Sequence, residues 1–260
     1  MNGKSRKYRL HGLPPYRTAV VHGGPGAIGS VGDLASELGR HFGTIEPFQT
    51  QDSIPALITE LEESLPREPV ILIGHSWGAW LSYLFSAEYP DRVKMLILLS
   101  SAPFEEGYAP EIEKKRLKRL DSQERKEYFH LLGMMAGKNA GDSCLSRFAE
   151  LMEKTDSYAL AVPNSQKAVI DLDLFRKIWG EASSLRKNGG LIRTVHSLFP
   201  DIIIIHGEDD PHPFEGVLYP LEKAHVRIAS HLLARCGHYP WREKYARKSF
   251  YRILLSCLRK

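Results

Sequence analysis

Residues 70–78 read Val-Ile-Leu-Ile-Gly-His-Ser-Trp-Gly, and this stretch decides the fold. The apolar run 70–73 is short and continuous, which is typical of a parallel strand covered on both faces. The pattern Gly-x-Ser-x-Gly follows at 74–78, and a helical pattern continues over 79–88. Strand, turn and helix in this order put the serine in a strained turn, with small residues two positions to either side. We therefore predict that Ser76 presents its Oγ as a nucleophile.

The same alternation of short apolar runs and helical patterns extends over most of the chain. Ser30 and Ser53 stand where helix N-caps are expected, and Pro90 ends the helix that follows Ser76. Further strands are predicted at 18–21, 43–46, 93–99, 202–205 and 225–230. Strands that alternate with helices predict an α/β protein, with a mostly parallel sheet flanked by helices.

Residues 104–188 depart from this alternation. They contain no strand-like run, and Asp121 with Glu124 predicts a capping box inside them. Amphipathic helical patterns cover 111–120, 123–135, 143–155 and 165–186. We interpret 104–188 as a helical cap inserted into a core domain that comprises residues 1–103 and 189–260.

A glycine-rich turn follows the first predicted strand and reads His22-Gly23-Gly24-Pro25-Gly26. Such a turn frees backbone N–H groups to point at a developing negative charge. A phosphate-binding turn is the competing interpretation, but no Lys-Ser/Thr follows and a GxGxxG register is not matched. We therefore favour an oxyanion loop.

A serine nucleophile needs a base, and the base needs a carboxylate that holds its tautomer. Strand 202–205 runs into a turn that contains Asp209 and Asp210, and the next predicted strand leads to His238. The chain order of serine, aspartate and histidine suits this architecture. Asp209 competes with Asp210 for the acid, because adjacent side chains cannot both face His238.

With HGGPG at 22–26, GHSWG at 74–78, GEDD at 207–210 and CGHYPW at 236–241, the chain resembles the α/β-hydrolase superfamily over nearly its whole length. The HGGPG loop, paired with a Trp after the serine, resembles the prolyl iminopeptidase branch, which cleaves N-terminal proline from peptides. The resemblance implies Ser76 as nucleophile with Asp210 and His238 as partners. It also implies the N–H groups of Gly24 and Trp77 as oxyanion donors.

Other residues carry weaker signals about the site. His75 either lines it or packs at the serine turn, and the remaining histidines are expected at the surface or in packing. Candidates for the walls of an apolar acyl or proline pocket, or else for the core, are Trp77, Trp80 and Trp179. Candidate acids for binding a free substrate amine are Glu105, Glu150 and Glu181.

Composition narrows the classes of partner. The 260 residues are 43% hydrophobic and 25% charged, as in globular proteins, and the net charge of +4 comes from scattered basic residues, which does not favour nucleic acid. No run approaches the roughly 18 apolar residues of a membrane helix, and no secretory signal is evident, so we expect a cytoplasmic protein. Three cysteines without CxxC spacing predict neither disulfides nor a metal site, and we expect no cofactor. The oligomeric state is left open.

The function that these residues favour is a serine hydrolase that cleaves a small carboxylic ester or amide through an acyl-enzyme. A proline iminopeptidase-like amidase acting on short peptides is second. Serine at the turn argues against the dehalogenases and epoxide hydrolases of the superfamily, which use a carboxylate there. The rival from another class is a non-catalytic ligand-binding protein of the same fold, which has no physical need for nucleophile, base, acid and oxyanion loop together.

Overall fold

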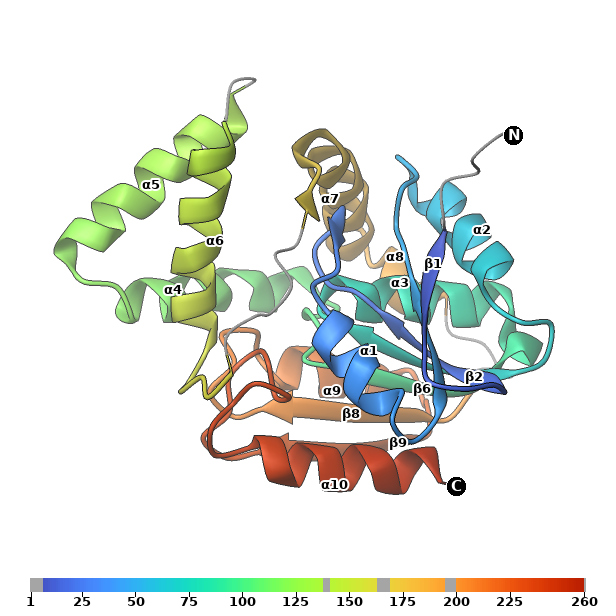
Figure 1. The fold of residues 1–260 in the computed structure, drawn as a ribbon. Helices are drawn as coiled ribbons and strands as arrows, with labels where there is room; N and C mark the ends of the chain where they lie inside the picture. The colour runs from blue at the N-terminus through green and yellow to red at the C-terminus, as the bar shows by residue number, and fades with distance from the viewer. Residues whose placement is uncertain (1–6, 138–140, 163–168, 195–199, 260) are drawn as a thin grey trace, which may run out of the picture.

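The computed structural model describes residues 7–137, 141–162, 169–194 and 200–259. At its centre is a seven-stranded sheet in the order β1-β4-β2-β5-β6-β8-β9 (Figure 1). β1 pairs antiparallel with β4, and every other neighbouring pair in this sheet is parallel. The strands are β1 (Tyr8–His11), β2 (Tyr16–Val21), β4 (Gly43–Pro47), β5 (Val70–His75), β6 (Val93–Leu99), β8 (Ile202–Gly207) and β9 (Ile228–Leu233).

Helices cover both faces of the sheet, as the continuous apolar strands require. Alternate residues of a strand point to opposite faces. Ile71 and Ile73 of β5 accordingly pack with α1 (Gly32–Leu38) and α10 (Arg247–Leu258). Val70 and Leu72 pack with the other set, which comprises α2 (Ile54–Ser64), α3 (Trp77–Glu88) and α9 (Glu215–Lys223). The parallel sheet flanked by helices, as predicted, is confirmed.

Between β6 and β8 the described residues 106–137, 141–162 and 169–187 form a largely helical part of the chain, called the insertion below. α4, α5 and α6 project together from one side of the molecule and share a small apolar cluster of their own, whereas α7 packs against the main core (Figure 1). The elements of this part are η2 (Glu106–Tyr108), α4 (Ala109–Lys118), α5 (Ser122–Ala136), α6 (Asp142–Asp156), β7 (Val169–Ile170), α7 (Leu172–Lys187) and, just after it, α8 (Gly190–Arg193).

The remaining short elements are η1 (Pro90–Arg92) and β3 (Ala27–Ile28), and β3 pairs antiparallel with β7. The sequence of 104–188 shows no strand-like run, and β7 was therefore not predicted, because a strand of two residues produces no readable alternation. The helix expected at 165–186 begins at Leu172, and its first predicted positions, 165–168, lie outside the described residues. The capping box of Asp121 and Glu124 is present at the start of α5.

Two further local predictions were wrong. The strand expected at 225–230 is β9 at Ile228–Leu233, because His225 takes a left-handed φ of 58° as the chain leaves α9. Ser30 is not an N-cap, since α1 begins after Val31. Ser53 does cap α2, through the N–H of Ala56. Over the described residues no helix is both long and apolar enough to span a membrane.

Candidate active site

Ser76 occupies the turn between β5 and α3 in the strained conformation that the sequence predicted, with φ 55° and ψ −120°. A Cβ on Gly74 would lie 2.3 Å from the carbonyl oxygen of Gly78, and one on Gly78 would lie 2.4 Å from that of Val21. Both positions therefore require glycine. Within 70–86 only Ser76 is partly exposed and all other residues are buried. The turn thus presents the serine and nothing else.

The glycine-rich loop 22–26 lies directly against this turn. A Cβ on Gly23 would stand 2.9 Å from the Cβ of Ser76, and the carbonyl of Gly24, at φ 62°, accepts the N–H of Ala27 at 2.9 Å. Pro25 lies inside the turn that this bond closes. The predicted oxyanion donors, Gly24 and Trp77, therefore belong to two backbone segments that meet at the serine.

Gln49 joins these two segments, and the sequence analysis missed it. Its Nε2 donates to the carbonyl of His22 at 2.8 Å, and the Nε1 of Trp77 donates to its Oε1 at 2.8 Å. Gln49 is 2% exposed, so both bonds are shielded from water. Burial lowers the pKa of His22, which keeps this loop residue neutral. A polar residue just after a buried strand was the sole sequence signal for Gln49.

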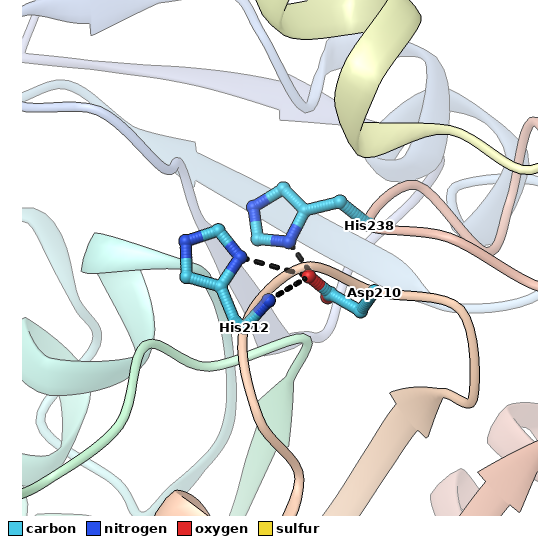
Figure 2. Close-up of side chains that lie close together, drawn as sticks. All are labelled: Asp210, His212 and His238. Atoms are coloured by element: carbon cyan, nitrogen blue, oxygen red, sulfur yellow. Dashed lines mark hydrogen bonds and ion pairs between the residues drawn. The ribbon is translucent and has the colours of Figure 1, made fainter. Parts of the chain in front are cut away.

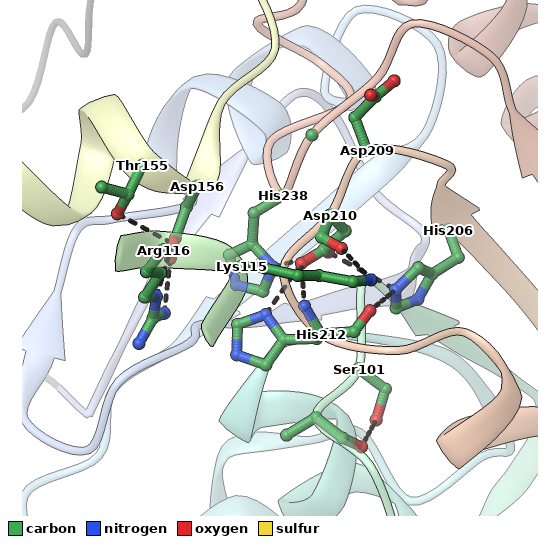
Figure 3. Close-up of polar contacts among 12 residues, drawn as sticks. Ser101, Lys115, Arg116, Thr155, Asp156, His206, Asp209, Asp210, His212 and His238 are labelled. Carbon is green, nitrogen blue, oxygen red and sulfur yellow. Dashed lines mark hydrogen bonds and ion pairs between the residues drawn. The ribbon is translucent and has the colours of Figure 1, made fainter. Parts of the chain in front are cut away.

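Asp210 and His238 meet at the carboxyl end of the sheet. His238 Nδ1 donates to Asp210 Oδ2 at 2.7 Å, and both side chains are buried (Figure 2). Asp209 is partly exposed and its carboxylate points away from His238 (Figure 3). Burial alone would raise the pKa of Asp210, but the nearby imidazoles, His238 first, hold it well below its usual value. Asp210 is the carboxylate that the histidine contacts.

A second histidine, His212, shares the same carboxylate. Its backbone N–H and its Nδ1 both donate to Asp210 Oδ1, at 2.9 and 2.8 Å, and its ring stacks on that of His238 with centroids 4.3 Å apart (Figure 2). Burial, and then the proximity of His238, lowers the pKa of His212 to about 4, so the ring is neutral at pH 7. The expectation that the remaining histidines only pack or face solvent overlooked this contact.

Asp210, His212 and His238 are also the one group in the described part of the chain whose ligand atoms, within 4.8 Å of one another, are close enough to hold a metal ion. Both Nδ1 atoms stand at 2.7 and 2.8 Å from the carboxylate. These are ordinary distances for N–H donors to a charged acceptor, and hydrogen bonding accounts for the whole arrangement.

His75 packs between the serine turn and the histidine loop. Its Nε2 donates to the carbonyl of His238 at 3.0 Å, and its ring lies edge-on to Trp241 at 4.8 Å. Burial, and then the proximity of His238, lowers the pKa of His75 well below its usual value. Among the tryptophans, Trp80 is fully buried core, whereas Trp179 is partly exposed and stacks on it at 6.1 Å.

The helical insertion contacts the loops that carry the acid and the base. Arg116 of α4 donates through Nε and Nη2 to the two oxygens of Asp156, each at 2.6 Å, and the carbonyl of Asp156 accepts the N–H of His238 at 2.7 Å. Lys115 Nζ donates to the carbonyl of Asp210 at 3.2 Å (Figure 3). Burial alone would raise the pKa of Asp156, but the charge and hydrogen bonds of Arg116 outweigh it and hold that pKa below its usual value.

The chain after α6 then runs along the histidine loop. The buried carboxylate of Glu243 accepts the N–H of Gly237 at 2.9 Å, that of Tyr158 at 2.8 Å and that of Ala159 at 2.7 Å. The N–H of Lys244 donates to the carbonyl of Ala159 at 2.7 Å. The loop that carries His238 is therefore bonded to residues just after α6.

The insertion also touches the glycine-rich loop. The N–H of Asp171 donates to the carbonyl of Gly26 at 3.3 Å, next to the β3–β7 pair. A Cβ on Gly26 would stand 3.1 Å from the carbonyl oxygen of Asp171, and its φ is 72°. Gly26 is thus needed both for its backbone conformation and for this close contact.

The three acids considered for amine binding differ in their surroundings. Glu181 Oε2 accepts the N–H of Ile54 at the start of α2, at 2.8 Å. Glu150 is exposed and pairs with Arg147. Glu105 is half-buried just before η2. Two of the three are therefore already engaged in structural contacts.

A serine at the turn between a parallel strand and a helix, together with an aspartate and a histidine that are bonded to each other on loops after later strands, is typical of the hydrolase class of α/β proteins. Residues 38–241 match the sequence model of the protein family described as alpha/beta hydrolase fold, and the chain belongs to that family.

Two solved structures share this fold, and a named protein is similar to this chain over a short stretch. An epoxide hydrolase from Bacillus megaterium has a TM-score of 0.61 at 19% identity, with 97% of this chain and 96% of that one covered. VinJ has a TM-score of 0.68 at 14% identity, with 97% and 94% covered. A (lyso)-N-acylphosphatidylethanolamine lipase from Bos taurus is 41% identical over 54 residues, which is 21% of this chain and 16% of that protein.

Proposed function

We propose that this protein is a serine hydrolase that cleaves a small carboxylic ester, or an amide, through an acyl-enzyme intermediate. The observation that carries the proposal is the 2.7 Å hydrogen bond from His238 to the buried Asp210. In the same chain, the turn between β5 and α3 exposes Ser76 and no other residue of 70–86. His238 takes the proton of Ser76 Oγ as this oxygen attacks the substrate carbonyl, and Asp210 holds the imidazole in the required tautomer. The N–H groups of Gly24 and Trp77 stabilise the oxyanion.

His238 then returns the proton to the departing alcohol or amine, which leaves the acyl group on Ser76. Water attacks this acyl group with His238 as base, and the free serine is regenerated. The cycle consumes one water and needs no redox change. An uncharged His238 is needed at the start, and the neutral histidines around it, His75 and His212, add no positive charge that would oppose its protonation.

The helical insertion is the natural candidate for substrate selection. We propose that residues 104–188 form a cap over the site, because this part contacts all three loops of the proposed machinery. The lipase among the relatives supports an acyl ester as substrate. The HGGPG loop together with Trp77 supports a proline iminopeptidase as the second candidate, and Glu105 is then the first acid to examine for amine binding.

A plate assay separates these possibilities. Initial rates are measured on a short-chain p-nitrophenyl ester and on proline p-nitroanilide with wild type, Ser76→Ala and the matched control Ser122→Ala, which alters an exposed serine on α5. Ser76→Ala should lose nearly all turnover with an unchanged melting temperature, and Ser122→Ala should keep it. Turnover on the ester alone supports the esterase, and efficient cleavage of the anilide supports the peptidase.

A fluorophosphonate probe tests the nucleophile without a chosen substrate. Wild type should be labelled at Ser76, and Ser76→Ala should not be labelled. Full turnover or labelling in Ser76→Ala contradicts the mechanism. A wild type that is neither labelled nor active on either substrate favours the non-catalytic ligand-binding protein.

A further inference from the structure

We propose that His212 is a positioning residue, which shares the Asp210 carboxylate with His238 and so limits how strongly that carboxylate supports the base. The proposal rests on the serine hydrolase function and adds a fourth side chain to its machinery. Hydrolysis by serine, histidine and aspartate does not itself require such a group. The role proposed for His212 rests on its contacts with Asp210 and His238.

The two histidines use different oxygens of Asp210. Oδ2 accepts from His238 at 2.7 Å, whereas Oδ1 accepts from the Nδ1 and the backbone N–H of His212, at 2.8 and 2.9 Å. Donors on both oxygens fix the plane of the carboxylate, so the oxygen that faces His238 cannot turn away. These contacts also spread the negative charge, because a donor on Oδ1 draws charge away from Oδ2.

The ring of His212 also supports the ring of His238 directly. The two rings stack with centroids 4.3 Å apart and an angle of 25° between their planes (Figure 2). The ring of His75, from β5, lies 4.7 Å from that of His238. His206 Nε2 donates to the carbonyl of His212 at 2.8 Å and anchors its backbone. The backbone of His212 is therefore fixed by His206, while its side chain contacts both Asp210 and His238.

The charged and titratable groups around this cluster come from several elements. His206 of β8 lies 3.5 Å from Asp210 Oδ2, and Lys115 of α4 reaches the Asp210 carbonyl. His75 of β5 and Tyr239 both contact the ring of His238. The ion pair of Arg116 and Asp156 lies in the insertion beside the cluster (Figure 3). The charges of Arg116 and Asp156 offset each other. None of these groups replaces the N–H donor that His212 supplies to Asp210 Oδ1.

Removal of the Nδ1 donor should therefore have two effects. The charge left on Asp210 favours the protonated form of the base, so the acid limb of the kcat/KM profile should move up by about one pH unit in His212→Leu. The loss of the ring contact should lower kcat about tenfold, because the base is less well oriented. His212→Asn keeps a short side-chain donor near the position of Nδ1, and should leave the acid limb within about 0.3 pH unit of wild type.

The first test is the pH profile of kcat/KM on the p-nitrophenyl ester for wild type, His212→Leu, His212→Asn and the control His130→Leu, which alters an exposed histidine on α5. The expected result is a displaced acid limb in His212→Leu alone, at a melting temperature that leaves the enzyme folded in the assay. A profile of His212→Leu that coincides with wild type overturns the proposal.

A second measurement does not depend on the Leu variant folding. Proton NMR of the wild-type protein should show two far-downfield imidazole N–H signals, one lost in His212→Asn and the other in His238→Gln. A single such signal, lost only in His238→Gln, overturns the sharing of Asp210. Two signals in a protein without Ser76-dependent turnover or labelling would refute the hydrolase function instead, so the two failures are distinguishable.

Discussion

Replacement of Arg116 by Leu should destabilise the protein strongly, and the structure indicates by how much. The side chain of Asp156 is 4% exposed and that of Arg116 is 20% exposed, and two 2.6 Å bonds join them. Removal of one partner of a buried ion pair leaves an uncompensated charge and costs about 3–5 kcal/mol. Because Arg116 retains some contact with water, we expect the lower end, about 3 kcal/mol of unfolding free energy. For a chain of this size that corresponds to a fall of about 6–12 °C in Tm.

The cost should depend on pH in a defined direction. The folded-state pKa of Asp156 lies below its ordinary value, so its contribution to stability is complete above about pH 5 and is lost as the pH falls through 4 and below. In Arg116→Leu the carboxyl has no partner, and protonation relieves it. The stability gap between wild type and variant should therefore be constant from pH 8 to about 5.5 and should shrink in acid.

The assay is urea unfolding at a series of pH values, followed by fluorescence, with kcat measured beside it. The carbonyl of Asp156 holds the N–H of His238, so we also expect kcat to fall at least tenfold. The double variant Arg116→Leu with Asp156→Leu is the control, and it should recover much of the lost stability because no charge is left buried. A single variant within about 1 kcal/mol of wild type at pH 7 would refute the reasoning.

Two further substitutions test the site itself. Asp210→Asn should lower kcat by about 10⁴-fold, because the amide no longer holds the histidine tautomer, whereas Asp209→Asn should have a small effect; the reverse ranking in a steady-state ester assay would reassign the acid. Gly23→Ala should lower kcat by about 100-fold, since its Cβ would stand 2.9 Å from that of Ser76 and displace the serine. Gly107→Ala, where a Cβ meets nothing within 4 Å, is the matched control, and equal kcat in the two alanine variants would contradict this account.

The parts of the fold that were predictable carry local signals. The strand expected at 93–99 coincides with β6 residue for residue, because residues 95–99 form a continuous apolar run whose last four residues are buried, although Lys94 near the start of the strand is exposed. The serine turn was predictable because its glycines fall in one run of five residues. The 2.3 Å contact that requires Gly74 lies within that run, whereas the 2.4 Å contact that requires Gly78 is with Val21 of β2. Strands of two residues, such as β3 and β7, carry no such signal.

The parts of the site that were missed depend on contacts between distant segments. A backbone hydrogen bond joins the N–H of His238 to the carbonyl of Asp156, at the end of α6. The carboxylate of Glu243 accepts three backbone N–H groups from two loops. Sequence spacing does not show which distant segments of the chain contact each other. His212 lies two residues from a predicted catalytic aspartate, yet a lone histidine is ordinarily a packed residue. Only its two hydrogen bonds to Asp210 Oδ1, from the backbone N–H and from Nδ1, distinguish it.

The hydrogen bonds between the segment after α6 and the loop around His238 have a consequence for protein engineering. They are made by Asp156, Tyr158 and Ala159. A chimaera that replaced the helical insertion with a segment from another protein, joined at the ends of the insertion, would remove these hydrogen bonds from the loop around His238. Residues 156–161 therefore belong, for the purposes of grafting, with the sheet and not with the helices that precede them. The same contacts constrain sequence change in this segment, because a substitution that moves the backbone of 156–161 also moves the loop around His238.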